Sequence, residues 1–315
     1  MTQDELKKEE ILFSKCCDDW LELKKTMVKE SSYFNYKFAV EKHIKPVLGN
    51  KTLQEMEHYD MNEFIKIKKE QGLTSSLKEL LVRVKSILKF TKKKYGINFD
   101  FDFRSGYVAK VGKLEVLSEK ERLKLTRFLS ETEDIRYLGV LICLYSGLRI
   151  GEICGLQWKD IDLETKEISV ERTVQRVYTG QGVKSKVIAT LPKTAKSLRR
   201  IPIAKNLLEI LKENKKKYDE NAFITTGEVD KSFEPFTYRY VYKQALKHCD
   251  IPYKKFHCLR HTVATRCIRL GMDIKSLSEV LGHSNIGTTM NIYVHSSYEV
   301  KKKYIDRLWN RVENK

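Results

Sequence analysis

Apolar residues recur every three or four positions through the first third of the chain, with charged residues between them. This spacing predicts amphipathic helices, because a half-buried strand would instead alternate apolar and polar residues. Pro46 is the one proline of the region, and the helix before it should end there. Asp60 and the pair Ser31 and Ser32 are suitable N-caps. We therefore expect a compact unit of four or five helices, with members over residues 11–30, 33–44, 61–69 and from 74 or 75 onward.

Residues 95–113 contain three glycines and little helical periodicity, which predicts a linker. Beyond it, Ser118 and Glu121 form a helix-start signature. The apolar residues 135–145 then predict a buried helix that Gly147 ends. We accordingly place a first, helical domain at residues 1–105, a linker at 106–114 and a second domain at 115–315.

The second domain also contains stretches rich in Val, Ile and Thr, which favour strands. Gly180 and Gly182 would join two of them as a hairpin. We expect strands over residues 166–178, 185–191, 200–202 and 222–225, and helices from 204, over 236–249, from 256 and over 274–281. The predicted fold class is mainly α-helical with a small antiparallel β-sheet, an α+β fold.

Lys and Arg number 60 against 42 Asp and Glu, which gives a formal charge of +18. Such an excess favours a polyanionic partner, and nucleic acid first of all, because bound cations release the counterions of the phosphates. Lysines between Lys66 and Lys94 cluster on the predicted helices, where they would either contact phosphates or form a solvated face. Since no run of about twenty apolar residues predicts a membrane span, we expect a soluble intracellular protein.

The seven cysteines are scattered among apolar neighbours, as is typical of reduced thiols in a long intracellular chain. His257, Cys258, His261 and His283 could be combined into a zinc site, but no pair has C-x-x-C spacing and no H-E-x-x-H motif occurs. A phosphate-binding G-x-x-x-x-G-K-[ST] loop is also missing from the sequence. We expect neither a metal nor another cofactor.

Residues 256–295 combine the residue types that covalent phosphoryl transfer through a tyrosine requires, namely His257, Arg260, His283 and Tyr293. His257, Arg260 and His261 are three or four positions apart, so they share one face of a helix. Each of these residues alone has an ordinary structural explanation. Together they indicate chemistry, because a tyrosine with a pKa near 10 needs a base and nearby cations to become a nucleophile at neutral pH.

Arg149, Glu152 and Lys193 are further candidates in the second domain. Arg149 starts a predicted helix, where it could either reach a phosphate or form an i,i+3 ion pair with Glu152. Lys193 lies in the basic segment P-K-T-A-K-S-L-R-R, where its flexible ammonium group could enter a DNA groove.

With these motifs in view, nearly all of the chain resembles the tyrosine recombinase, or phage integrase, family. The boxes S-G-L-R-I-G-E-I-C-G-L, F-H-C-L-R-H-T-V-A-T and L-G-H-S-N-I-G-T-T-M-N-I-Y resemble the family's two arginine motifs and its nucleophile motif, in the family's order. S-Y-F-N-Y-K-F-A-V-E-K-H-I-K-P-V-L-G resembles the SAM-like core-binding domain. The segment around Lys193 resembles the hairpin of integrases from phages and conjugative transposons.

The resemblance implies a role for each candidate residue. Tyr293 would attack a scissile phosphate and form a 3′-phosphotyrosine, which releases a 5′-hydroxyl, and the link would conserve the bond energy without ATP. Arg149 and Arg260 would bind the nonbridging oxygens, His257 would accept or share the tyrosine proton, and His283 would donate a hydrogen bond to the phosphate. Lys193 would protonate the leaving oxygen and Glu152 would orient the arginine and histidine side chains, while His261 would be structural.

The resemblance also implies a cytoplasmic, nucleoid-associated location in a prokaryote, and it implies partners. Double-stranded DNA core sites would be held by a clamp of two domains, and a homotetramer on two sites would exchange strands through a Holliday junction. An excisionase-like or host DNA-bending protein is a further possible partner. The tail over residues 300–312 would form a helix and dock on a neighbouring protomer rather than on its own domain, through the apolar residues Tyr304, Ile305, Leu308 and Trp309.

One departure from the family concerns the N-terminus, since the core-binding pattern begins within about ten residues of Met1, and we therefore do not expect recognition of arm sites. We therefore expect a recombinase that acts on short core sites, for integration or excision of a mobile element. A DNA-binding regulator without catalysis and a type IB topoisomerase-like enzyme that relaxes DNA are the alternatives. The regulator would not need Tyr293, and the topoisomerase would act as a monomer.

Overall fold

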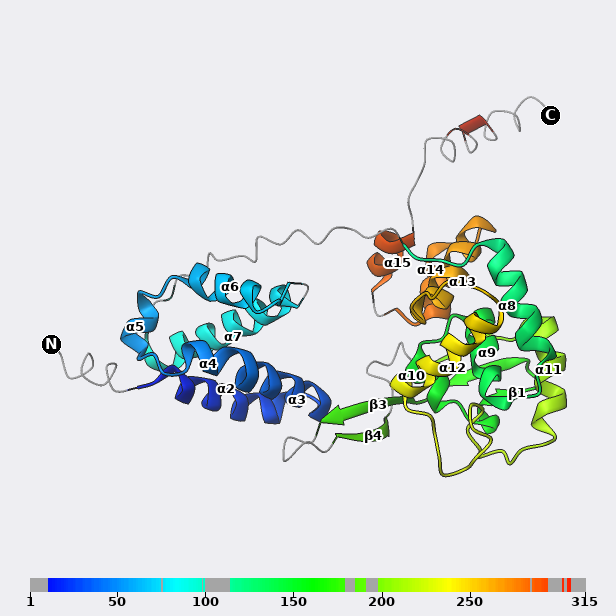
Figure 1. Ribbon diagram of the computed structural model, residues 1–315, viewed down its shortest axis with the longest axis horizontal. Coiled ribbons are helices and arrows are strands. Elements are labelled where there is room, and N and C mark those ends of the chain that lie inside the picture. The colour runs from blue at the N-terminus through cyan, green and yellow to red at the C-terminus, as the bar shows by residue number, and fades with distance from the viewer. Residues whose placement is uncertain are drawn as a thin grey trace. The chain divides into compact units, whose positions relative to one another are not determined.

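The computed structural model describes residues 11–74, 76–97, 99, 114–178, 185–190, 198–283, 285–293, 302, 305 and 306. The chain divides into two compact units, residues 1–112 with 177–186 and residues 113–176 with 187–315, both drawn in Figure 1. Lys193, the expected hairpin turn at Gly180 and Gly182, and most of the apolar tail lie outside the described residues. No helix in the described ranges is both long and apolar enough to cross a membrane.

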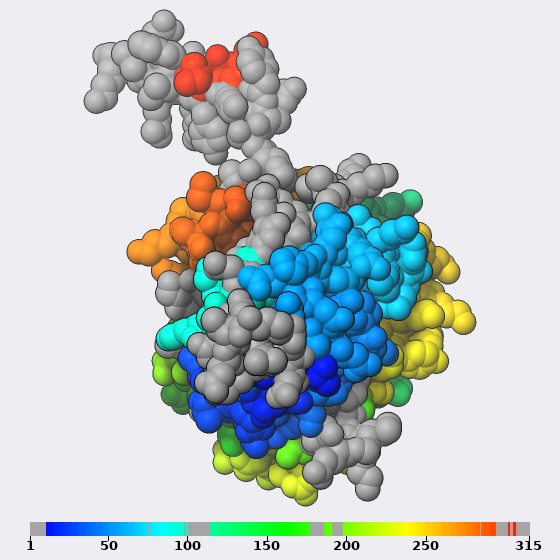
Figure 2. Space-filling model, turned by 90° about the vertical axis from the view of Figure 1, so that its left-hand side faces the viewer, coloured from blue at the N-terminus to red at the C-terminus, as the bar shows by residue number. Residues whose placement is uncertain are grey.

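The first unit is a group of helices around one apolar core, coloured blue to cyan in Figures 1 and 2. Its elements are α2 (Phe13–Met27), α3 (Glu30–Ala39), a π-helical turn (Val40–Ile44), α4 (Lys45–Leu48), α5 (Leu53–Glu57), α6 (Met61–Glu70) and α7 (Leu77–Tyr95). Trp20, Ile44, Phe64 and Val84 are almost fully buried between them. The apolar spacing of the sequence therefore identified the buried faces of these helices.

The ends of these helices follow the sequence less closely. Ser31 and Ser32 lie inside α3, which begins one residue earlier, so the prediction that they cap it is wrong. The helix was also expected to end before Pro46, but the chain stays helical and Pro46 takes the second position of α4. A backbone N–H at that position would have no hydrogen-bond partner within the helix, so proline, which lacks this N–H, is tolerated there. Asp60 does cap α6, accepting a hydrogen bond from the N–H of Asn62 at 2.9 Å.

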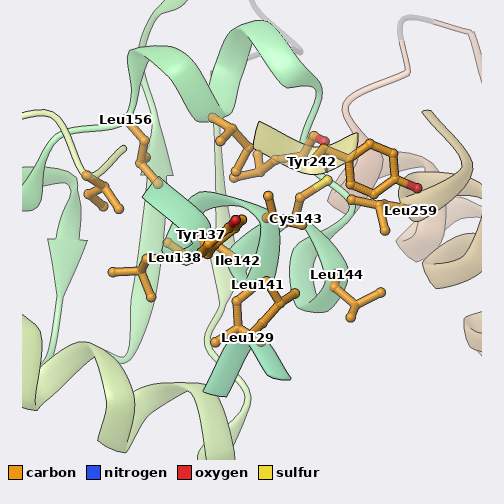
Figure 3. Close-up of a cluster of buried hydrophobic side chains, with 14 of the residues drawn as sticks. Leu129, Tyr137, Leu138, Leu141, Ile142, Cys143, Leu144, Leu156, Tyr242 and Leu259 are labelled. Atoms are coloured by element: carbon orange, nitrogen blue, oxygen red, sulfur yellow. Dashed lines mark hydrogen bonds between the residues drawn. The ribbon is translucent and has the colours of Figure 1, made fainter. Parts of the chain in front are cut away.

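The second unit surrounds α9, an almost wholly apolar helix whose side chains fill its core (Figure 3). Its helices are α8 (Glu119–Glu131), α9 (Leu138–Ser146), α10 (Ile150–Gly155), α11 (Lys205–Lys215), α12 (Pro235–His248), α13 (His257–Arg269), α14 (Ile274–Leu281) and α15 (Ile286–Tyr293). Ser118 and Glu121 form the expected capping box of α8. Cys143 of α9 lies close to Tyr242 and Leu259 in Figure 3, and all three belong to one buried cluster, so α9 joins α12 and α13 in one core.

The strands form two small sheets instead of the single sheet that was expected. One contains β1 (Ile161–Asp162), β2 (Glu167–Val170) and β5 (Arg199–Pro202), with antiparallel pairs, and the other contains β3 (Thr173–Tyr178) and β4 (Ser185–Thr190). The predicted strand 166–178 is interrupted at Arg172, whose guanidinium group binds the buried Asp160. The strand expected over 222–225 is a turn with one isolated bridge from Phe223 to Gln157.

Candidate active site

The C-terminal end of α14 is the centre of the candidate site. Gly282 ends this helix in a left-handed conformation with a φ of 65°. The last carbonyl groups of an α-helix lack partners within the helix and carry partial negative charge. Here three guanidinium groups from three other segments donate to them. Arg199 binds the carbonyl of Val280 at 2.7 Å, Arg260 that of Leu281 at 2.7 Å and Arg149 that of Gly282 at 2.8 Å.

Glu152 of α10 joins two of these arginines. Its carboxylate accepts hydrogen bonds from Arg149 Nη1 at 2.8 Å and from both terminal nitrogens of Arg199 at 3.1 and 2.9 Å. Only 4% of Glu152 is exposed. Burial alone would raise the pKa of this carboxyl group, but the bonds and charges of Arg199 and Arg149 outweigh it and hold the pKa below its usual value. Glu152 is therefore ionised and fixes both guanidinium groups.

Arg260 of α13 is almost fully buried and lies beneath the site. It donates to the carbonyls of Gly147 at 2.9 Å and Leu281 at 2.7 Å, and so connects the end of α9 with the end of α14. Burial, with the charge of Arg149 adding to it, lowers the pKa of Arg260 to about 10. The side chain therefore keeps its charge at neutral pH.

Three imidazole groups and the hydroxyl of Tyr293 complete the site. His257 and His261 are one helical turn apart on α13, with ring centroids 4.5 Å apart at 88°. Nδ1 of His261 lies 2.7 Å from the hydroxyl oxygen of Tyr293, the last residue of α15. His283, directly after Gly282, places its Nδ1 2.7 Å from Thr289 Oγ1.

The titration of these groups follows from their surroundings. Burial lowers the pKa of His257 and of His283, and together with the neighbouring guanidinium groups, and with His261 in the case of His257, it brings both values to about 4. Burial raises the pKa of Tyr293, although the charges of Arg260 and Arg149 act in the opposite direction. At neutral pH the imidazoles are thus uncharged and the phenol keeps its proton.

The second unit therefore joins Arg149, Glu152 and Arg260 around the end of α14. His283 and Tyr293 lie close enough to Arg149 and Arg260 for these charges to lower the pKa of both groups. His257 is adjacent, but in the described part of the chain no hydrogen bond joins it to Tyr293; the tyrosine oxygen is instead bound by His261, which was expected to be structural. The position of Lys193 lies outside the described residues.

Arg199 is a residue of the site that the sequence analysis did not select. Its side chain is 6% exposed and it binds Glu152 and the end of α14 at once. The alternation of buried and exposed residues along β5 could have indicated that Arg199 is buried. Arg199 shares the inward face of the strand with the buried Ile201, whereas Arg200 points outward. An arginine in phase with buried positions must have buried partners.

The zinc alternative does not fit the geometry. Cys258 Sγ points into the core and lies 3.1 Å from the hydroxyl of Tyr242, away from the other proposed ligands. Within the ranges that the structure describes, no group of three or more His, Cys, Asp or Glu residues could hold a metal ion.

Comparison with protein families identifies the class. Residues 115–300 match a model described as the phage integrase family, and residues 12–68 match one described as phage integrase, N-terminal SAM-like domain. The first match covers more than half of the chain. The chain therefore belongs to the phage integrase family, and both the resemblance inferred from its motifs and the expected α+β fold class are confirmed.

Relatives with names support this placement. The chain is 34% identical to a tyrosine recombinase XerC-like protein of Caldanaerobacter subterraneus over 62% of its own length and 54% of the relative. It is 26% identical to the ICEBs1 integrase of Bacillus subtilis, with 89% and 78% covered. The chain thus spans about half the length of the first relative and most of the second. A structure of the Tn1549 transposon integrase with a circular intermediate DNA has the same fold, with a TM-score of 0.79, 22% identity and coverage of 95% and 100%.

Replacing Arg199 should destabilise the protein. Arg199→Met leaves the buried carboxylate of Glu152 with Arg149 as its one ion-pair partner among the described side chains, and we expect the free energy of unfolding to fall by about 3 kcal/mol. Arg200→Met is the matched control on the exposed face of β5, where the change should stay within about 0.5 kcal/mol. Urea denaturation measures both. Equal losses in the two variants would show that the contact with Glu152 contributes little.

The same variant should alter the response to acid. The lowered pKa of Glu152 stabilises the fold above the carboxyl group's unfolded value, and this contribution is lost as pH falls through the folded value. Without Arg199 the folded pKa rises, so acid unfolding of Arg199→Met should begin at higher pH than in the wild type. A pH titration followed by circular dichroism tests this, and coincident curves would contradict it.

Gly282 should be irreplaceable for a reason beyond its backbone angle. A Cβ at this position would lie 2.8 Å from Arg199 Nη1, in addition to the strain of its left-handed conformation. Gly271 is the control, since its φ is 88° but a Cβ there meets nothing within 4 Å. Gly271→Ala should lose about 1 kcal/mol of stability, and Gly282→Ala clearly more. Urea denaturation measures both losses, and equal losses in the two variants would argue against the crowding at Arg199.

Proposed function

We propose that the protein is a site-specific DNA recombinase that cuts and rejoins strands through Tyr293. The observation that carries the proposal is a tyrosine hydroxyl held next to an imidazole at the end of a network of fixed guanidinium groups. Such a field stabilises negative charge on a phosphate during attack. Membership of the phage integrase family supports the same reaction.

In the proposed reaction Tyr293 Oη bonds to phosphorus and the bond to the 5′-oxygen breaks, which leaves a 3′-phosphotyrosine and a 5′-hydroxyl. Arg149 and Arg260 bind the nonbridging oxygens as donors that are already oriented by Glu152 and by backbone carbonyls. His283 donates a further hydrogen bond to the phosphate. Rejoining is the reverse reaction with a different 5′-hydroxyl.

Two protons must move in each strand cut. The tyrosine loses one, which we assign to the imidazole pair of α13, with His257 accepting or sharing it. The leaving oxygen gains one, which we assign to Lys193 on the basis of the family resemblance. Because the phosphodiester is exchanged for a phosphotyrosine, the bond energy is conserved and no nucleotide triphosphate is needed.

Double-stranded DNA is the proposed partner, and the charge of +18 supports it. We propose residues 1–105 as a core-binding domain, 106–114 as a linker and 115–315 as the catalytic domain. Exposed lysines of α7, including Lys89, Lys92 and Lys93, are candidate phosphate contacts. The tail over 300–312 would dock on a neighbouring protomer.

The named relatives support a mobile element as the substrate of the reaction, since they include integrases of ICEBs1 and of the transposon Tn1549. We propose integration or excision by a homotetramer on two core sites, with a Holliday junction as the intermediate. An excisionase-like or DNA-bending protein would then set the direction.

The test is a covalent adduct assay on DNA. Fragments of the source genome that the protein binds are recovered, nicked next to the bound region to trap the intermediate, and incubated with protein before denaturation in SDS. We expect an adduct mapped to Tyr293 with wild type and with Tyr253→Phe, a control at an exposed tyrosine, but none with Tyr293→Phe. Tight binding without any adduct would instead support a DNA-binding regulator. Relaxation of any supercoiled plasmid without recombinant product would support a topoisomerase-like enzyme.

A further inference from the structure

The hydroxyl group of Thr289 is the partner of the His283 ring. Its Oγ1 lies 2.7 Å from Nδ1 of His283, and Thr289 is fully buried, with 0% of its surface exposed. Among the residues that the structure describes, neither of these two atoms has another hydrogen-bond partner. The contact therefore occupies Nδ1 and leaves Nε2 as the ring nitrogen that can meet a ligand.

The two partners are held in place by the ends of the helices that carry them. His283 follows the left-handed Gly282, and its backbone N–H donates to the carbonyl of Ser278 in α14 at 3.0 Å. At the start of α15 the side-chain oxygen of Asn285 accepts from the N–H of Gly287 at 2.8 Å, as a helix cap does. The end of α14 and the start of α15 therefore bring the imidazole and the hydroxyl together.

The position of the ring proton follows from a count of donors and acceptors. A threonine hydroxyl has one proton to donate, and a neutral imidazole donates from one nitrogen and accepts at the other. If Nδ1 of His283 carried the proton, the hydroxyl of Thr289 would accept it. Its own proton would then be buried without a partner in the described part of the chain, which is unfavourable. If the hydroxyl donates to Nδ1 instead, both groups are satisfied and the ring proton lies on Nε2.

The charge state of the imidazole makes this choice important. Burial lowers the pKa of His283, and the charged groups around it add to this effect and bring the value to about 4, so the ring is neutral at pH 7. A neutral imidazole presents either an N–H or a lone pair at Nε2, and a phosphate oxygen can bind only the N–H. The neighbouring guanidinium groups of Arg260, Arg149 and Arg199 do not favour that N–H, because they are donors without an acceptor atom.

We propose that Thr289 is a positioning residue that fixes the ring proton of His283 on Nε2, so that the neutral imidazole can donate to a nonbridging phosphate oxygen; the inference rests on the proposed function. Thr289 precedes Tyr293 by four positions and so shares its face of α15. Both residues are buried, whereas Thr288 and Met290 beside Thr289 are exposed. The helix that carries the nucleophile thus also sets the proton of the phosphate donor.

Thr289→Val is the direct test, because valine keeps the volume of the side chain and removes its hydroxyl. On the nicked substrate at pH 7 we expect adduct formation to slow by about tenfold or more with DNA binding unchanged, since a single donor to the developing charge is worth at least this much. Thr289→Ser restores the hydroxyl and should recover most of the rate.

Thr288→Val is the matched control at the exposed neighbouring threonine, and it should keep the wild-type rate. A wild-type rate in Thr289→Val would overturn the proposal. So would equally slow reactions of Thr289→Val and Thr289→Ser, or an equal loss in Thr288→Val, because the hydroxyl of Thr289 would then not be the cause.

Nitrogen NMR of the unaltered protein covers the case in which a variant does not fold. With ¹⁵N-labelled histidine at pH 7, the signals of His283, assigned by their loss in His283→Gln, should show Nε2 protonated and Nδ1 unprotonated. A protonated Nδ1 would contradict the proposal. In Thr289→Val the Nδ1 signal should lose the shift caused by the hydrogen bond, which a purely structural role of Thr289 would not predict. Failure of the proposed function is distinct, since it would show as no Tyr293 adduct in the wild type itself.

Discussion

The candidate site depends on how one short helix ends. The carbonyls of Val280, Leu281 and Gly282 point out of α14 with no helical partner, and three arginines supply the missing donors. Each arginine comes from a different segment, so the helix end fixes α10, β5 and α13 relative to one another. The carboxylate of Glu152 offsets part of the positive charge, but three cations outnumber one carboxylate. A phosphate diester, which carries one negative charge, is the kind of ligand that this remaining positive charge would bind.

Burial and the same positive charge together set the state of the histidines. Burial is the larger cause of the pKa of about 4 at His257 and His283, and the neighbouring guanidinium groups add to it because they disfavour a second positive charge. A neutral histidine can accept a proton or orient a hydrogen bond, whereas a charged one could only donate. The network that would bind the phosphate therefore also prepares the groups that would move protons, and the two tasks do not require separate structures.

Much of this site could be predicted from the sequence, because Arg149, Glu152, His257, Arg260, His283 and Tyr293 lie in contiguous segments with recognisable spacing. The prediction was incomplete where the partner is distant in sequence. Arg199 reaches Glu152 across 47 positions and Val280 across 81, and nothing local indicates either contact. His261 was interpreted as structural because spacing places it on a helix face but does not say which imidazole faces α15. The fold shows the same limit. The apolar periodicity predicted the interiors of the helices, but it did not predict the helical position of Pro46 or the break between β2 and β3.

The direction of the pKa changes at Tyr293 and at the imidazole pair of α13 explains why such a site would not ionise its nucleophile at rest. Burial raises the pKa of the phenol and lowers that of both imidazoles, so proton transfer from the phenol is uphill when no phosphate is attacked. The transfer becomes favourable only as the Oη–P bond forms and the phenol becomes acidic. In the reverse direction the imidazolium is a strong acid that readily returns its proton to the departing phenolate. An imidazolium formed during cleavage would therefore be acidic enough to return its proton to the phenolate when the strand is rejoined.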